Sequence, residues 1–241
     1  MILLWIYSGL TITDSTYDTD SRLDTTSEET RSATLVVVDP QRVASDNFNR
    51  YVFARVTDIG KPKVDVLARF FEGRPHVKVV PVFGRAESIK MDRFEQDVQL
   101  VITASNTVPS RLAVARFAVR HGLAHVSAAL ADGRAGCSGF VTAWMPERPD
   151  LACPACFLTP RARLDRGESL LATVVSVVGA LAARLAVQLL AVKHRPSALG
   201  AGNCLTIDVE RYVVESLRVL NRQDCLACAG VRGSVKGRRH R

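Results

Sequence analysis

From Thr34 onward, short apolar runs rich in β-branched residues alternate with segments whose apolar residues recur at helical spacing. The runs predict strands at residues 34–38, 77–82, 98–104, 124–130, 140–144, 204–209 and 212–217. The helical spacing predicts helices at residues 62–74, 109–121 and 170–193. This alternation predicts an α/β fold, a Rossmann-like, doubly wound and mainly parallel sheet with helices on both faces.

Residues 11–32 differ from everything after them, because 17 of these 22 residues are Ser, Thr, Asp or Glu and no apolar face recurs. Such a segment buries too little surface to offset the entropy of ordering. We therefore predict a disordered, atypical N-terminal segment at 1–33, a folded domain at 34–230 and a basic flexible tail at 231–241. An alternative for residues 2–7, ILLWIY, is a strand added to the sheet.

The net charge of +8 is unevenly distributed, with −4 over residues 1–33 and +12 over the remainder. Only six of the 32 basic residues are Lys. Arginine suits phosphate and carboxylate binding, although a GC-rich genome gives the same bias. Nucleic-acid binding is supported only by the charge and the KGRRHR tail, so we expect no nucleic-acid partner.

Two segments resemble membrane signals by their apolar content. The first ten residues lack a basic region, so a signal peptide is not expected. Residues 170–192 are long enough to span a membrane, but Arg184 lies well inside this run, where insertion is costly. We predict a buried helix there, no membrane association and a cytoplasmic location.

Four of the six cysteines form two CxxC pairs, Cys153 with Cys156 and Cys225 with Cys228. Two such pairs, without a convincing secretion signal, are typical of a tetrahedral structural zinc site. The alternative is a pair of redox motifs, but a redox CxxC opens a helix after a strand, and these pairs lie in predicted loops. The remaining two cysteines, at 137 and 204, lie in apolar runs and are expected to be buried.

An acid, Asp39, ends the first strand of the predicted domain. In a nucleotide-binding sheet the acid that binds the ribose ends the second strand, and Asp39 fits that place. It is followed by Asn47, Arg50, Gly60 and Lys63 in the pattern Asn-x-x-Arg then Gly-x-x-Lys. This spacing, the later LVITASNTVPSR and GCSGFVTAWMPE stretches and the two CxxC pairs resemble the E1-like, THIF-type adenylating enzymes. These are bacterial activators of sulfur-carrier proteins and relatives of ubiquitin-activating enzymes. The resemblance covers residues 34–230.

The resemblance implies ATP- and magnesium-dependent adenylation of the C-terminal Gly-Gly carboxylate of a small ubiquitin-like or sulfur-carrier protein. It implies Arg50 and Lys63 as catalytic cations on the phosphates. It also implies Asp39, Asn47 and Asn106 at the nucleotide, and a homodimer or heterodimer.

Three departures from the family pattern favour a degenerate enzyme. No glycine-rich phosphate loop precedes Asp39, and the abrupt change near Ser32 suggests a truncated or frameshifted start. Asn106 and Thr103 stand where the family has acids, and an uncharged amide is a poorer magnesium ligand. No cysteine nucleophile lies between the first CxxC and the long helix.

The alternative function is a non-catalytic, zinc-stabilised scaffold, or a partner subunit of an intact E1-like homologue. A nicotinamide or flavin oxidoreductase rests only on the shared nucleotide-binding fold.

Overall fold

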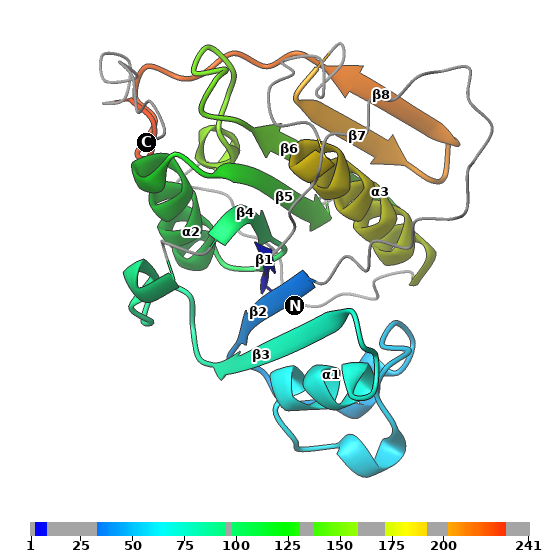
Figure 1. The fold of residues 1–241 in the computed structure, drawn as a ribbon. Coiled ribbons are helices and arrows are strands. Elements are labelled where there is room, and N and C mark those ends of the chain that lie inside the picture. Colours follow the sequence, from blue (N-terminus) through cyan, green and yellow to red (C-terminus); the bar gives the residue numbers. More distant parts are fainter. Residues whose placement is uncertain are drawn as a thin grey trace, which may run out of the picture.

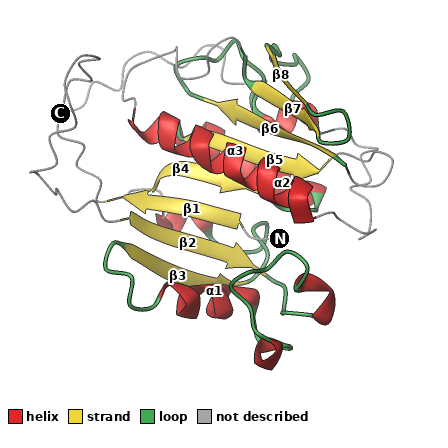
Figure 2. Cartoon of the chain, turned by 90° about the vertical axis from the view of Figure 1, so that its right-hand side faces the viewer, coloured by secondary structure: helices red, strands yellow, loops and turns green. Residues whose placement is uncertain are grey.

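The computed structural model describes residues 3–8, 33–94, 98–130, 137–158, 172–191 and 202–229. Their strands form one sheet in the order β3-β2-β1-β4-β5-β6-β7-β8 (Figures 1 and 2). The strands are β1 (Leu3–Ser8), β2 (Ala33–Asp39), β3 (Val77–Phe83), β4 (Val98–Thr103), β5 (Ala124–Leu130), β6 (Ser138–Trp144), β7 (Cys204–Asp208) and β8 (Val213–Leu217). The α-helices are α1 (Lys63–Phe71), α2 (Val108–His121) and α3 (Ala172–Ala191).

The predicted α/β fold class is confirmed. Strands β2, β3, β4, β5 and β7 point the same way, whereas β1, β6 and β8 point the other way. The carboxyl ends of β2 and β4 therefore lie at one edge of the sheet, where open α/β sheets bind their ligands.

Strand β1 occupies the place between β2 and β4, antiparallel to both. It fits the alternative prediction for residues 2–7 and differs from the disorder predicted for 1–33. A strand here pairs two apolar strands that would otherwise each present an open edge. Residues 9–32 and 230–241 lie outside the described residues, so the predictions for the rest of the acidic segment and for the tail stay predictions.

The helices cover both faces of the sheet. On one face, Val37 of β2 packs with Val64 and Leu67 of α1, and α3 covers β4, β5 and β6. On the other face, Val36 and Val38 pack in one cluster with Val114 and Phe117 of α2. This is the doubly wound arrangement that the alternation of elements predicts.

Helix α3 is less buried than predicted. One stripe, including Val174, Val178 and Ala186, packs on the sheet, whereas Val187 is 55% exposed. The helix is the one candidate for a membrane span among the described helices, by length and composition alone, and 33% of its most apolar window is buried. Its Ala- and Val-rich sequence carries no polar face, so periodicity could not distinguish one-sided from complete burial.

Candidate functional site

The four predicted metal ligands converge, although 68 residues separate the two pairs. The sulfurs of Cys153, Cys156, Cys225 and Cys228 all lie within 4.8 Å of one another, and all four residues are buried. The Sγ–Sγ distances include 3.9 Å from Cys153 to Cys156, 3.7 Å from Cys153 to Cys225 and 3.6 Å from Cys156 to Cys228. Sulfurs placed tetrahedrally about 2.3 Å from a zinc ion are about 3.8 Å apart. The donor set therefore fits a structural zinc ion.

Backbone pairing between distant segments brings the two pairs together, and we call the resulting unit the clasp (151–158 with 219–229). Leu151 and Leu220 form an isolated β-bridge, and the amide of Ala152 donates to the carbonyl of Val219 over 2.8 Å. The first CxxC forms a short 3-10 helix, Pro154–Phe157, whose turn leaves both of its sulfurs on the same side as the second pair.

Asn203 joins the clasp to the sheet and was not found by sequence reasoning. Its side-chain amide donates to the carbonyl of Ala152 over 3.1 Å, and its side-chain oxygen accepts from the amide of Val219 over 2.7 Å. The residue is 2% exposed. No local sequence signal marks such a role, because its partners lie 51 and 16 residues away.

Hydrogen bonds among the four thiols shift their pKa values in opposite directions. The Cys153 thiol lowers the pKa of Cys156 to about 7 and also lowers the pKa of Cys225, while the pKa of Cys153 itself is raised by Cys156. The backbone amide of Arg222 also faces the sulfur of Cys156, at 3.5 Å. Metal binding needs deprotonated sulfur, so a bound cation would displace the remaining thiol protons.

A second group of predicted residues meets at the carboxyl end of β2, and we call it the strand-end crevice (Asp39, Gln41, Asn47, Arg50, Tyr51 and Lys63). Asp39 is fully buried and accepts from the amide of Gln41 over 2.6 Å. Asn47 is 4% exposed, and its side-chain oxygen accepts from the amide of Ala44 over 3.1 Å. Asn47 therefore fixes the loop that carries Arg50.

The two predicted cations share one aromatic neighbour, Tyr51. The Lys63 ammonium donates to the Tyr51 hydroxyl over 3.1 Å and to the Gln41 side-chain oxygen over 2.8 Å, and it lies 4.8 Å from the ring centroid. The guanidinium of Arg50 lies 5.6 Å from the same centroid and donates to the carbonyl of Asp46. Lys63 is 3% exposed, so its charge acts in a poorly hydrated environment.

Burial shifts the pKa values of Lys63 and Tyr51 in this crevice. Desolvation lowers the pKa of Lys63, whereas the nearby Asp39 carboxylate opposes that shift. Desolvation, followed by the field of Asp39, raises the pKa of Tyr51 to about 12. Tyr51 is therefore a neutral hydroxyl at neutral pH.

Asp58 braces the helix start that carries Lys63. Its buried carboxylate accepts two hydrogen bonds of 2.6 Å from Arg69 of α1 and one of 2.9 Å from the amide of Arg55. The Arg69 bonds, followed by the Arg55 bond, hold the pKa of Asp58 far below its ordinary value. Gly60, with φ +85°, makes the turn between Asp58 and α1, a conformation that side chains rarely adopt.

Comparison with known proteins gives a family. The ThiF family matches residues 32–227. The chain belongs to the ThiF family.

Among curated proteins, the catalytic subunit of the NEDD8-activating enzyme E1 of Arabidopsis thaliana is 33% identical over 78 residues, which is 32% of this chain and 17% of that protein. Among solved structures, E. coli MccB with ATP has a TM-score of 0.62 at 16% identity and covers 80% of this chain and 59% of MccB. PaaA has a TM-score of 0.57 at 15% identity and covers 76% of this chain and 63% of PaaA. The chain thus spans about three-fifths of the MccB chain, and these structures show the fold alone.

The structure shows two of the expected departures from the ThiF pattern, at β1 and at Thr103. Because β1 runs antiparallel, it presents its first residue, not its last, at the edge where β2 and β4 end, and the described residues supply no glycine-rich turn there. Thr103, at an expected acid position, is fully buried and its hydroxyl lies 2.7 Å from the Nε2 atom of His125. Burial lowers the pKa of that His to about 3.

Two remaining ThiF expectations have less support. Asn106 follows β4 at the same sheet edge and is exposed, and among the described residues no hydrogen bond joins its side chain to the strand-end crevice. Most of the stretch without a cysteine nucleophile, residues 159–171, lies outside the described residues.

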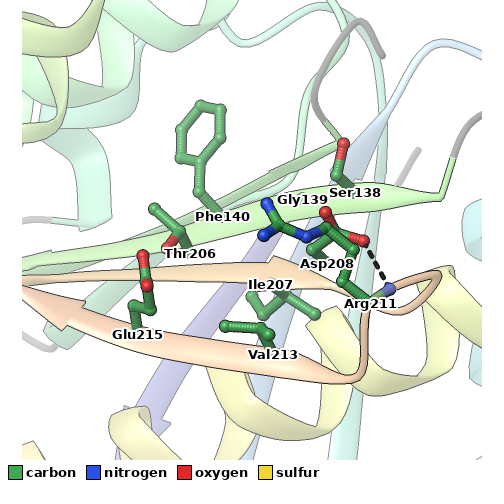
Figure 3. Close-up of a pocket in the computed structure, with 9 residues that line it drawn as sticks. All are labelled: Ser138, Gly139, Phe140, Thr206, Ile207, Asp208, Arg211, Val213 and Glu215. Atoms are coloured by element: carbon green, nitrogen blue, oxygen red, sulfur yellow. Dashed lines mark hydrogen bonds between the residues drawn. The ribbon is translucent and has the colours of Figure 1, made fainter. Parts of the chain in front are cut away.

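A hollow of about 310 Å³ lies elsewhere, lined by residues of β6, β7 and β8 and of the turn between β7 and β8 (Figure 3). It is lined by Phe140, Thr206, Asp208, Arg211 and Glu215, among others. In the sheet order, three strands separate β6 from β2, so this hollow is distinct from the strand-end crevice.

Proposed function

We propose that this protein is an E1-like adenylating protein that binds ATP at the strand-end crevice. Its substrate would be the C-terminal carboxylate of a small ubiquitin-like or sulfur-carrier protein ending in Gly-Gly. In the reaction, a carboxylate oxygen bonds to the α-phosphorus and the bond from that phosphorus to the bridging oxygen of pyrophosphate breaks. The products are an acyl-adenylate and pyrophosphate. The observation that carries the proposal is the meeting of Lys63 and Arg50 beside Asp39 at a strand end.

Each residue of the crevice has a separate role in this proposal. Arg50 binds phosphate oxygens through its planar fork, and Lys63 stabilises the charge that builds up on the leaving pyrophosphate. Asp39 accepts from a ribose hydroxyl, and Asn47 holds the loop in place. Mg²⁺ would neutralise phosphate charge, with the amide oxygen of Asn106 as the ligand this chain offers in place of an acid.

The names of the relatives support the substrate class. A solved MccB structure contains ATP, another contains MccA, and the Arabidopsis relative is named for NEDD8. We propose a structural zinc ion in the clasp, a homodimer or a heterodimer with an E1-like homologue, and a cytoplasmic location.

The deciding test is ATP–pyrophosphate exchange with zinc-loaded protein and purified carrier proteins that end in Gly-Gly. We expect label from pyrophosphate to enter ATP only when carrier is present, because adenylation is reversible. A carrier that lacks its final two glycines is the matched control. Exchange that is absent with every carrier, or equal with the truncated control, would overturn adenylation.

The second candidate function is a non-catalytic, zinc-stabilised partner subunit. The antiparallel β1 and the buried Thr103 favour it, because both remove parts of a phosphate and metal site. It predicts that the protein binds an intact E1-like homologue and that exchange appears only in the mixture. It also predicts that Lys63→Met leaves the exchange rate of that mixture unchanged.

A further inference from the structure

A basic cleft lies on the α2 face of the molecule, away from the strand-end crevice. Its volume is about 620 Å³, and it is formed by α2 and by a short 3-10 helix, Met91–Phe94. Four exposed cations surround it: Lys90, Arg93, Arg116 and Arg120. Apolar side chains of Ile89, Met91 and Phe117 also line the cleft.

One carboxylate, Asp92, lines the cleft with these four cations. It lies 3.7 Å from the guanidinium of Arg120 and 3.1 Å from Nε2 of His121. The lining thus carries a net charge of +3, from four cations and one anion. Like charges that line one cleft repel one another, so the cleft favours an anionic occupant.

The acidic stretch of the chain is attached at the same edge of the sheet as this cleft. Strand β1 ends at Ser8, which pairs with Ala33 at the start of β2, so residues 9–32 leave and return at one point. Tyr7 pairs with Val98, the start of β4, and only residues 95–97 separate Val98 from the 3-10 helix of the cleft. Arg120 likewise lies four residues before Ala124, which starts β5 at this edge.

Length and charge both suit this stretch. Each half of the 24 residues between Ser8 and Ala33 can reach about 40 Å when extended. Residues 11–32 carry six acids and two arginines. The acids are Asp14, Asp18, Asp20, Asp24, Glu28 and Glu29.

We propose that the acidic stretch 11–32 binds in the basic cleft of its own chain. It neutralises a surface that would otherwise attract other polyanions. This inference is independent of the proposed adenylation.

Zero-length carbodiimide cross-linking of the full chain, read by mass spectrometry, tests the proposal. Lys90 should form amides with acids of residues 14–29. Lys61 and Asp58 lie 3.1 Å apart outside the cleft, and their cross-link is the internal positive control. Equal mixing of ¹⁵N-labelled and unlabelled protein separates cross-links within one chain from those between copies.

Charge reversal gives the matched comparison. Arg93→Glu with Arg120→Glu, or neutralisation of the six acids to Asn and Gln, should lower the Lys90 cross-links about ten-fold, as should 0.5 M NaCl. Arg211→Glu with Arg218→Glu, on the β7–β8 side, should change them less than about two-fold. The proposal is overturned if Lys90 links only to its neighbour Asp92 or links only between copies. It is also overturned if the yield of Lys90 cross-links changes neither on reversal of Arg93 and Arg120 nor on neutralisation of the six acids.

Discussion

The clasp and the strand-end crevice were both predicted from spacing in the sequence, yet the structure completes them to different degrees. In the clasp, four identical soft donors meet at distances suited to one ion. In the crevice, the cations and Asp39 meet, but the described residues include no glycine-rich turn beneath them. Four thiols define a metal site by themselves, whereas a phosphate site also needs backbone N–H groups in a particular geometry.

Loss of one clasp ligand should have the largest effect. Cys225→Ser removes a sulfur whose three partners lie within 4.8 Å, and we expect loss of zinc and about 5 kcal/mol or more of unfolding free energy. Metal analysis and chemical denaturation measure both quantities. Cys204→Ser, at a buried cysteine outside the clasp, is the matched control and should keep its zinc. Full stability and unchanged zinc content in the Cys225 variant would show that Cys225 is not a ligand of the metal.

Loss of the buried lysine should affect chemistry more than folding. Lys63→Met keeps most of the side-chain volume but removes the charge, and we expect ATP–pyrophosphate exchange to fall about 100-fold. Lys61→Met is the control, because Lys61 bonds Asp58 at the surface and should change the rate less than about two-fold. Equal losses in the two variants would remove Lys63 from the reaction.

The contribution of the Asp58 carboxylate to folding stability should be lost in acid. Asp58→Asn should lower the melting temperature at pH 7 by more than Asp65→Asn, at an exposed position of α1. The folded pKa of Asp58 is lowered, so its stabilisation is present above the unfolded value of about 4 and is lost as pH falls toward the folded value. The difference between wild type and Asp58→Asn should therefore shrink from pH 7 to pH 3. A difference independent of pH would contradict the role of this carboxylate.

The smallest effect concerns the hydroxyl of Tyr51. Tyr51→Phe keeps the ring over both cations and removes one hydrogen bond to Lys63, so we expect the Kd for ATP to rise about three- to five-fold. Tyr51→Ala removes the ring as well and should weaken binding further. Calorimetry of both variants measures the difference, and a Kd equal to that of wild type in both would show that Tyr51 does not position Lys63.

Sequence patterns found the parts whose signal is local. The two CxxC spacings identify the ligands, and Pro62 with Gly60 places Lys63 at a helix start, although α1 ends at Phe71 instead of 74. In the hairpin of β7 and β8, each strand was predicted one residue too long on the side of the turn, because the turn includes Tyr212 with φ +55°.

Parts whose signal is tertiary were missed. The roles of Gln41, Tyr51 and Asn203 depend on partners 12 to 51 residues away. Residues 3–8 form a strand that pairs with both β2 and β4, whose edges would otherwise be open. Their own apolar pattern could suggest a strand but could not identify these partners.

Nucleotide binding at the strand-end crevice is tested most directly by an equilibrium titration of ATP with Mg²⁺ into zinc-loaded protein, beside Arg50→Ala. We expect saturable binding to wild type at millimolar ATP or below, and a Kd about ten-fold higher or more in the variant, because a charged hydrogen bond to phosphate is lost. Absence of binding at millimolar ATP, or identical binding by both proteins, would contradict the assignment of the strand-end crevice as a nucleotide site.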